Sequence, residues 1–281
     1  MHKLPEFFAV GPPRTATTWL HEVLTGHVNL PRIVKEPRFF DLRYSKGLAW
    51  HRRHFEPIFE GLPIGEISPT YFYSIDAIRR IAQLTPQAKI LITLRDPVKR
   101  LYSLYKMKVG DGTIRMSFKD AVRRHPEMIE SNRYEFYIRK WIGTFGEKQT
   151  LVIMQEELLR DAGAYLDKVC RFIGIPPFEV SDAEGRRRSN SADEPCSATV
   201  KWLSAIAVRA ADSLNTNNFA RTMAVVRKLG VRKLFLRDEP VRIPPLDPEF
   251  AEQMRREMRP QIESLEVLLN TDLSAWKPRS S

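Results

Sequence analysis

The sequence predicts an α/β fold, in which a central parallel sheet is flanked by helices and followed by a C-terminal helical region. Continuous apolar runs at 7–10, 90–94 and 151–154 are typical of strands that are covered on both faces. Each run leads into a segment in which apolar residues recur at helical spacing. Strands that alternate with helices in this way favour a parallel sheet.

The composition predicts a globular protein with an acidic partner. The chain has 281 residues, enough for one large domain or two small ones, and 43% of them are hydrophobic. The net charge of +11 points to a polyanionic cofactor, an anionic substrate, nucleic acid or a membrane surface. Because the charge is spread along the chain, we expect no nucleic-acid-binding arm.

The sequence also predicts a cytoplasmic location. No apolar run approaches the length of a transmembrane helix, and the first strand begins too early to leave room for a secretory signal. The two cysteines, Cys170 and Cys196, have no metal-binding or redox spacing. We expect a reducing compartment, with Cys170 as a core residue.

The first strand ends in a Gly-Pro turn that carries Arg14 and a cluster of hydroxyls. A helix over about 15–25 follows and ends at Gly26. At such a junction, free backbone N–H groups and the positive end of the helix dipole converge, and Arg14 adds a full charge. The sequence therefore predicts that this loop binds a phosphate-like group, with an ordinary strand-to-helix turn as the alternative.

The loop departs from the P-loop pattern of nucleoside-triphosphate-binding proteins, G-x-x-x-x-G-K-[ST]. Gly11 opens the loop, but Ala16 and Thr17 stand where the second Gly and the Lys belong. The basic residue has moved forward to Arg14, whose guanidinium is a forked donor instead of a point charge.

A second motif, Arg95-Asp96-Pro97, follows the strand at 90–94. Asp before Pro predicts the N-cap and first turn of a helix, so we expect Arg95 to be the last strand residue at the carboxyl edge of the sheet. Ser103 lies about two helical turns further on. A guanidinium and a hydroxyl in these positions can converge on one phosphate.

Together the two motifs resemble the signatures of sulfotransferases that use 3′-phosphoadenosine 5′-phosphosulfate (PAPS). The chain looks like a bacterial member of this family and is similar to the sulfotransferases of the carbohydrate and heparan type. The family usually has Lys and Gly where this chain has Arg14 and Ala16. The resemblance implies a single domain over 1–281 with a P-loop-type three-layer fold. It implies a core at about 5–178 and 246–276, and a helical insertion or lid at about 181–245.

The resemblance also implies the reaction: a sulfuryl group moves from PAPS to a hydroxyl or amine of the acceptor by in-line displacement, without a metal. Arg14 is expected to neutralise the leaving phosphate, and Arg95 with Ser103 to hold the 3′-phosphate of the donor. Arg186, in a basic loop at 181–194, is expected to close over that phosphate, with a solvated loop as the alternative. The donor-binding residues implied in this way are Arg14, Thr15, Ala16, Thr17, Thr18, Trp19, Arg95, Ser103 and Arg186.

The resemblance assigns the catalytic base to Glu36. In sulfotransferases that act on polysaccharides, a Lys/Glu-x-x-Phe-Phe-Asp stretch supplies this carboxylate, and here we expect Glu36 at the end of a short strand before Pro37. His21 and His27 are rival bases. Arg38 replaces a His of several relatives, and would hold a sulfate oxygen or lower the basicity of Glu36.

A strand at 64–68 and the residues after it resemble the family pattern Gly-Glu-Lys-[ST]-Pro-x-Tyr, with Ile67 in place of the Lys. Tyr71 is a candidate contact to cofactor or acceptor, because ligands bind at the carboxyl ends of such strands. Near the C-terminus, a helix capped at Asp247-Pro248 is expected to kink at Pro260.

The acceptor stays open between a sugar, a glycolipid and a small metabolite, and the oligomeric state stays open as well. A P-loop kinase or nucleotide phosphotransferase is the alternative function, but it needs the loop Lys that this chain lacks. A nucleic-acid-binding protein needs clustered Lys and Arg with exposed aromatic residues, which the sequence does not have.

Overall fold

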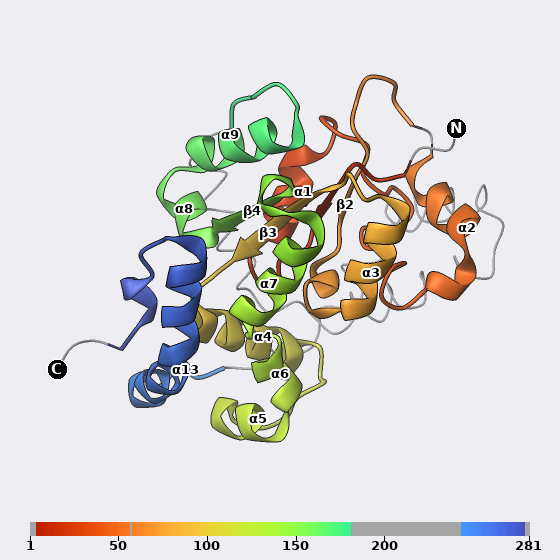
Figure 1. The fold of residues 1–281 in the computed structure, drawn as a ribbon. Helices are drawn as coiled ribbons and strands as arrows, with labels where there is room; N and C mark the ends of the chain where they lie inside the picture. Colours follow the sequence, from red (N-terminus) through yellow and green to blue (C-terminus); the bar gives the residue numbers. More distant parts are fainter. Residues whose placement is uncertain (1–3, 57, 181–242, 279–281) are drawn as a thin grey trace.

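The computed structural model describes residues 4–56, 58–180 and 243–278. Its centre is a four-stranded parallel sheet with the strand order β2-β1-β3-β4 (Figure 1). The strands are β1 (Phe7–Ala9), β2 (Gly65–Ile67), β3 (Lys89–Leu94) and β4 (Thr150–Met154). The predicted α/β class is confirmed.

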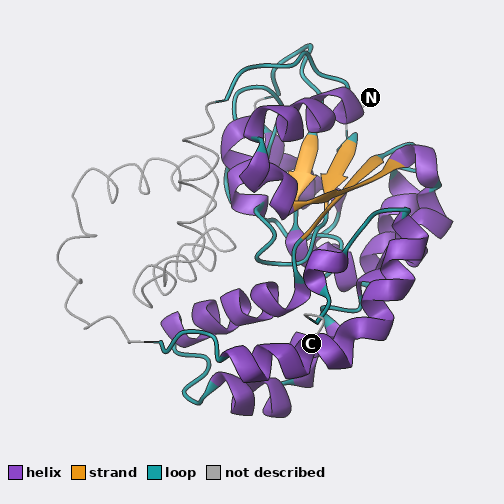
Figure 2. Ribbon diagram, turned by 90° about the vertical axis from the view of Figure 1, so that its left-hand side faces the viewer, coloured by secondary structure: helices purple, strands orange, loops and turns teal. Residues whose placement is uncertain are grey.

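Helices cover both faces of the sheet, so the chain forms three layers (Figure 2). On one face, α1 (Thr17–Leu24) and α9 (Ala162–Ile173) share a core with Phe7 and Ala9 of β1. The other face packs against four helices: α3 (Ile75–Leu84), α4 (Pro97–Gly110), α7 (Tyr134–Phe145) and α13 (Pro248–Leu269). The sheet is therefore buried on both sides, as its apolar runs predict.

Shorter helices connect these layers. They are α2 (Leu48–Arg52), α5 (Phe118–Arg124), α6 (Pro126–Glu130) and α8 (Gln155–Arg160), and the 3₁₀ helices η1 (Tyr44–Lys46), η2 (Arg53–Phe55), η3 (Pro69–Tyr73), η4 (Glu147–Gln149) and η6 (Ser274–Trp276). Within the described ranges, no helix has both the length and the apolar content to cross a membrane. The expected lid at about 181–245, including Arg186, lies outside the described residues except for 243–245.

Three expectations about element boundaries are wrong. No strand forms at 33–36, because Pro31 and Pro37 remove backbone N–H donors and side chains from other elements fix this loop instead. The first helix begins at Thr17 and not near Thr15, because Ala16 before it has a left-handed backbone with φ of 66°. Strand β3 likewise ends at Leu94, one residue before Arg95.

The C-terminal helix α13 runs as one element from Pro248 to Leu269, with Pro260 inside it. The Asp247 carboxylate accepts a hydrogen bond from the Glu249 N–H at 3.0 Å and caps the helix. Its buried stripe joins the core shared by α4 and α7. The helix therefore belongs to the layer that also contains the second sequence motif.

The close packing of β1 and β2 depends on a glycine. A Cβ atom added at Gly65 would lie 2.0 Å from Cζ of the Phe7 ring, a distance that no real contact tolerates. Gly65 and Phe7 are also paired in the register of the two strands. The missing side chain at Gly65 thus makes room for the Phe7 ring in the core.

We expect Gly65→Ala to lower the free energy of unfolding by about 1–3 kcal/mol, because the added methyl forces Phe7 and its strand to shift. Urea unfolding followed by circular dichroism measures this change. Gly143→Ala is the matched control, since nothing lies within 4 Å of a Cβ at Gly143 in α7. It should stabilise by roughly 0.5–1 kcal/mol. Equal effects of the two substitutions would contradict the packing argument.

Candidate functional site

The loop between β1 and α1 is held against β3 by buried polar contacts. A Cβ atom at Gly11 would lie 2.0 Å from Oγ1 of Thr93, so the two backbones approach as closely as only glycine allows. The Thr15 hydroxyl donates to the Pro12 carbonyl at 2.8 Å and accepts from the Thr93 hydroxyl at 2.7 Å. Thr15 is fully buried, so its hydroxyl serves to hold the loop against β3.

The turn itself uses left-handed backbone conformations. Arg14 and Ala16 have φ angles of 79° and 66°, which cost about 1–2 kcal/mol each for residues with a Cβ. A glycine would adopt this conformation without that cost. Left-handed residues in a tight loop allow successive N–H groups to face the same concave side, an arrangement that binds anions.

The first turn of α1 contributes three of the predicted site residues. Thr17 and Trp19 are buried, and the Trp19 ring packs edge-on against Tyr165 with 5.7 Å between centroids. Thr18 is exposed. This turn can therefore offer an anion its backbone N–H groups and the Thr18 hydroxyl, while the Trp19 side chain belongs to the core.

One hydrogen bond joins the two sequence motifs. Nε of Arg14 donates to the hydroxyl of Ser103 at 2.9 Å, across 89 residues of sequence. Arg14 lies in the loop between β1 and α1, which is called the phosphate loop after its predicted ligand, and Ser103 lies on the buried side of α4. The structure thus brings the guanidinium predicted for one phosphate next to the hydroxyl predicted for the other.

Arg95 stands between β3 and α4, in a segment fixed from several sides. Its carbonyl accepts a hydrogen bond from the Tyr134 hydroxyl at 3.0 Å. The next residue, Asp96, caps α4 by accepting from the N–H groups of Val98 and Lys99 at 2.9 and 3.1 Å. The predicted cap is confirmed, and Arg95 is half-buried at the carboxyl end of β3.

Asp96 also ties this motif to distant elements. Its second carboxylate oxygen accepts from Nη2 of Arg255 in α13 at 2.6 Å, and its N–H donates to the Glu156 carboxylate at 2.9 Å. Arg255 donates with Nη1 to the Trp276 carbonyl at 2.7 Å. The C-terminal segment is therefore fastened directly to the motif that carries Arg95.

Arg100 is a positively charged residue whose role in the site the sequence does not reveal. It is fully buried, and its guanidinium donates to Oδ1 of Asn132, to the Ser131 hydroxyl and to the carbonyl of Pro13 in the phosphate loop, at 2.6, 2.6 and 3.2 Å. Among the described residues it forms no ion pair with a carboxylate. Only its helical spacing from Asp96 and Ser103 could have suggested this position.

Glu36 lies in the loop beside the phosphate loop. Its neighbour Lys35 donates with Nζ to the Thr18 hydroxyl at 3.0 Å, and so joins the two loops. Burial raises the pKa of Glu36, while the positive charges of Lys35 and Arg38 partly oppose the shift. The carboxylate makes no hydrogen bond or ion pair to another residue in the described ranges. Glu36 is therefore a carboxylate of increased basicity next to the loop between β1 and α1.

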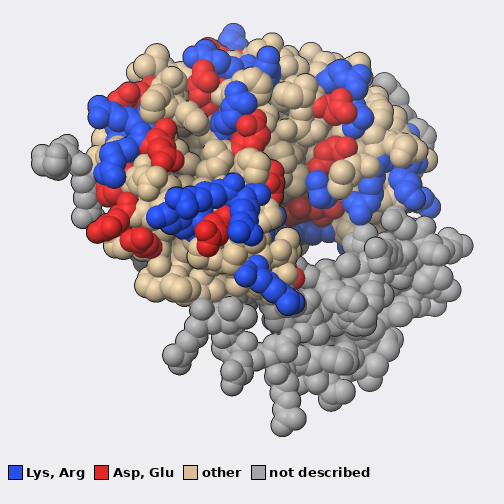
Figure 3. Space-filling model, turned by 90° about the horizontal axis from the view of Figure 1, so that it is seen from below, with Lys and Arg blue, Asp and Glu red and all other residues tan. Residues whose placement is uncertain are grey.

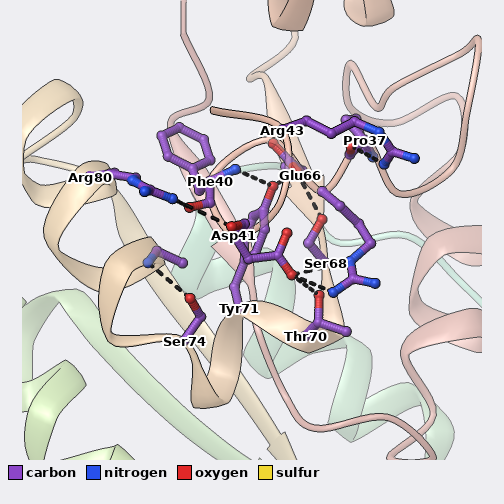
Figure 4. A network of polar contacts seen from close by, with 12 residues as sticks. Pro37, Phe40, Asp41, Arg43, Glu66, Ser68, Thr70, Tyr71, Ser74 and Arg80 are labelled. Carbon is purple, nitrogen blue, oxygen red and sulfur yellow. Dashed lines mark hydrogen bonds and ion pairs between the residues drawn. The ribbon is translucent and has the colours of Figure 1, made fainter. Parts of the chain in front are cut away.

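Side chains from η3 and α3, and from Arg43 just after the loop, hold the loop at 36–41 in place (Figure 4). Arg38 donates to the Asp41 carboxylate at 2.7 Å, and the Thr70 hydroxyl donates to the same oxygen at 2.7 Å. Arg80 of α3 donates to the Phe40 carbonyl at 2.7 Å, and Arg43 donates to the Pro37 carbonyl at 2.9 Å. Arg38 is thus engaged by Asp41, and the loop is ordered without secondary structure.

The two rival histidines differ from Glu36. Burial, with the charge of Lys35 as a second cause, lowers the pKa of His21 to about 4, which makes its imidazole a weaker base. His27 is exposed beyond the C-terminal end of α1 and stacks on Phe178 with 3.6 Å between centroids. The phosphate loop lies at the opposite end of that helix.

Tyr71, a candidate ligand contact from the sequence, is instead part of the core. Tyr71 is fully buried, and its hydroxyl donates a hydrogen bond to the Glu66 carboxylate at 2.6 Å. The hydroxyl oxygen of Tyr71 also accepts a hydrogen bond from the Phe40 N–H at 3.1 Å. The expectation that Tyr71 touches a ligand is therefore wrong. Its position at the end of β2 was predicted correctly, but its burial depends on partners far away in the sequence.

The surface seen from below carries a band of Lys and Arg side chains with Asp and Glu at its borders (Figure 3). The positive charge on this face is therefore interrupted by acidic groups. In the described part of the chain, no group of three or more His, Cys, Asp or Glu side chains is arranged to hold a metal ion. Arg186 lies outside the described residues.

The comparison with family models gives one match: a model described as "Sulfotransferase domain" covers residues 4–265. Among curated proteins, the chain is 30% identical over 205 residues to the bifunctional heparan sulfate N-deacetylase/N-sulfotransferase 4 of Mus musculus. It is 29% identical over 182 residues to the heparan sulfate glucosamine 3-O-sulfotransferase 3A1 of the same species. The matches cover 64% and 62% of this chain, but 23% and 46% of the two relatives, so the chain spans less than half of either.

Among solved structures, the fold is similar to that of a sulfotransferase from Alicyclobacillus acidocaldarius, with a TM-score of 0.70 and 22% sequence identity. The superposition covers 98% of this chain and 99% of that one. The similarity therefore extends over the whole three-layer arrangement.

Replacing Arg100 with Lys should lower the free energy of unfolding by about 2–4 kcal/mol, because an ammonium cannot reach all the buried acceptors that the guanidinium satisfies. Urea unfolding at neutral pH measures the loss. Arg133→Lys, at a side chain that is 45% exposed, is the control and should change the value by at most about 0.5 kcal/mol. If Arg100→Lys were no more harmful than the control, the buried contacts would contribute little.

Proposed function

Because the chain belongs to the sulfotransferase family, we propose that it transfers a sulfuryl group from PAPS to a hydroxyl or amine of a sugar-containing acceptor, with Glu36 as the general base. The observation that carries the proposal is the 2.9 Å hydrogen bond between Arg14 and Ser103. It holds the loop that carries Arg14 directly against α4, so that the residues proposed for the two phosphates of the donor lie side by side.

In this proposal, two groups of residues bind different parts of the donor. Arg14 and the N–H groups of residues 14–18 hold the 5′-phosphosulfate at the N-terminus of α1. Arg95 and Ser103 hold the 3′-phosphate, which is the feature that separates PAPS from ATP. The buried charge of Arg100, which contacts the loop through the Pro13 carbonyl, adds positive potential to the same region.

The proposed reaction is an in-line displacement at sulfur. A bond forms between sulfur and the acceptor oxygen or nitrogen, while the bond between sulfur and the 5′-phosphate oxygen breaks. Glu36 accepts the proton of the acceptor, and Arg14 with the loop N–H groups stabilises the charge on the leaving phosphate. The products are the sulfated acceptor and adenosine 3′,5′-bisphosphate.

Three observations support Glu36 over the histidines as base. Its raised pKa makes the ionised form more basic, whereas the lowered pKa of His21 has the opposite effect. The contact between Lys35 and Thr18 holds the neighbouring residue against the phosphate loop. The Glu36 carboxylate is not consumed by a hydrogen bond within the described residues.

A glycan is the acceptor class that we propose, because the curated relatives act on heparan sulfate according to their names. A glycolipid or a small sugar-containing metabolite offers the same hydroxyl or amine. The half-buried basic side chains of Arg43 and Arg52 follow the Glu36 loop and suit an anionic sugar chain.

The donor site predicts that the protein binds adenosine 3′,5′-bisphosphate more tightly than ATP with magnesium. Arg95→Ala should weaken the binding of the bisphosphate by roughly tenfold to a hundredfold, because a charge-assisted contact to the 3′-phosphate is lost. Calorimetric titration of the wild type and of Arg95→Ala with each nucleotide measures these affinities. Arg160→Ala, an exposed residue of α8, should bind like the wild type. Preference for magnesium-ATP would instead indicate a kinase.

The base assignment predicts that Glu36→Gln lowers turnover by about a hundredfold or more and leaves the affinity for the bisphosphate unchanged. The measurement is transfer of labelled sulfate from PAPS to heparan sulfate oligosaccharides. Glu157→Gln, a capping residue of α8, is the control. Because the pKa of Glu36 is raised, wild-type turnover should already fall with decreasing pH above the ordinary pKa of 4.5. Unchanged turnover of Glu36→Gln would move the assignment to His21.

A further inference from the structure

A buried carboxylate that the proposed reaction does not use is connected to the loop that carries Glu36. Glu66 lies in β2 and is fully buried. The hydroxyls of Ser68 and Tyr71 donate to its Oε1 at 2.8 and 2.6 Å (Figure 4). Nε2 of His51 lies 2.7 Å from its Oε2. Hydrogen-bond partners on both oxygens offset the cost of removing a buried carboxyl group from water.

The contact from Glu66 to the loop runs through Tyr71. The Tyr71 oxygen accepts a hydrogen bond from the Phe40 N–H at 3.1 Å, so its own proton points toward Glu66. Burial, and after it the negative charge of Glu66, raise the pKa of Tyr71, so the hydroxyl keeps that proton. The backbone four residues after Glu36 is thereby held by a directional chain of two hydrogen bonds.

His51, the third partner of Glu66, holds the same loop by packing. Its ring stacks on Phe39 with 4.6 Å between centroids and 17° between planes. It meets the Phe40 ring edge-on at 5.3 Å. Both phenylalanines are fully buried and anchor the loop in the core. Tyr71 and His51, which contact Glu66, therefore also contact the residues that anchor the loop.

Glu66 also differs from the other acid beside Glu36. Both Glu66 and Asp41 raise the pKa of Glu36, but Asp41 is neutralised by its ion pair with Arg38 at 2.7 Å. Glu66 has no Lys or Arg partner in the described ranges: its partners are the Ser68 and Tyr71 hydroxyls and the His51 imidazole.

We propose that Glu66 is a positioning residue for sulfuryl transfer: through Tyr71 and His51 it fixes the loop that carries Glu36, and it supplies a fixed negative charge beside that carboxylate. This role rests on the proposed function of Glu36 as the base. This role assigns a function to Glu66, Ser68 and Tyr71 in the segment at 65–71, where Ile67 stands in place of the Lys of the family pattern. The charged and titratable groups that face Glu36 are Lys35, Arg38, Asp41, Glu66 and Tyr73.

The electrostatic part is tested by the titration of Glu36 in protein labelled with ¹³C at the glutamate side-chain carboxyls. The resonance of Glu36 is assigned by its loss in Glu36→Gln, and the measurement needs neither PAPS nor an acceptor. Glu66→Gln, which removes the charge and keeps the shape, should lower the midpoint of Glu36 by roughly 0.5–1 pH unit. Glu157→Gln should leave it in place. An unchanged midpoint in Glu66→Gln would overturn the proposal.

The positioning part is tested with Tyr71→Phe, which removes the acceptor of the Phe40 N–H and keeps the ring. Turnover on heparan sulfate oligosaccharides should fall about tenfold, while the dissociation constant of adenosine 3′,5′-bisphosphate stays unchanged. Tyr165→Phe is the matched control, because that hydroxyl is buried and has no partner among the described residues. If both variants turned over like the wild type, Tyr71 would not position the loop. If Glu66→Gln does not fold, Tyr71→Phe still tests whether the Glu66–Tyr71 contact positions the loop.

The outcomes separate this role from the proposed function. If the wild type does not bind the bisphosphate, or if Glu36→Gln keeps its turnover, the function or its base is wrong whatever Glu66 does. If Glu36→Gln loses turnover while Glu66→Gln leaves both midpoint and rate unchanged, the role of Glu66 alone is wrong. A loss of rate in Glu66→Gln without a shift of the midpoint would reduce Glu66 to a structural residue.

Discussion

The close approach of the first loop to β3 is the constraint on which the rest of the site depends. Gly11 leaves no room for a Cβ beside Thr93, and Thr15 can bridge the two segments only because they are this near. The bridge holds the turn in which Arg14 has a left-handed backbone. That turn in turn presents the guanidinium to Ser103 on the helix after β3. A single steric requirement thus sets the distance between the two sequence motifs, those of Arg14 and of Arg95 with Ser103.

The loop that carries Glu36 is ordered in a different way. Residues 36–41 form no helix or strand, and their order comes from side chains of other elements, among them Thr70 and Arg80. Irregular loops placed on a rigid scaffold commonly carry catalytic groups, and their precision depends on such clamps. The Glu66 network is the buried part of this clamp, and the contacts of Asp41 are its more accessible part.

Local signals in the sequence predicted local structure well. The apolar runs gave the strands, and Asp96-Pro97 gave the cap of α4, because both depend on neighbouring residues. Tyr71 was misjudged because its burial depends on Glu66 and Phe40, which no local pattern reports. Arg100 was missed as a site residue for a related reason: a charged residue is expected at the surface, and only tertiary contacts with Asn132 and Pro13 explain its burial.

The buried Arg100 also links folding to the charge of the ligand. Its hydrogen bonds all go to neutral oxygens of the described residues, so its positive charge is solvated by dipoles but not cancelled. A buried charge of this kind destabilises the empty protein and attracts an anion to the adjoining loop. An anion that binds only the native state returns that stability through mass action. The phosphate loop is therefore expected to be most firmly ordered when a polyanion is bound to it. The ligand then supplies the negative charge that balances the buried Arg100 guanidinium.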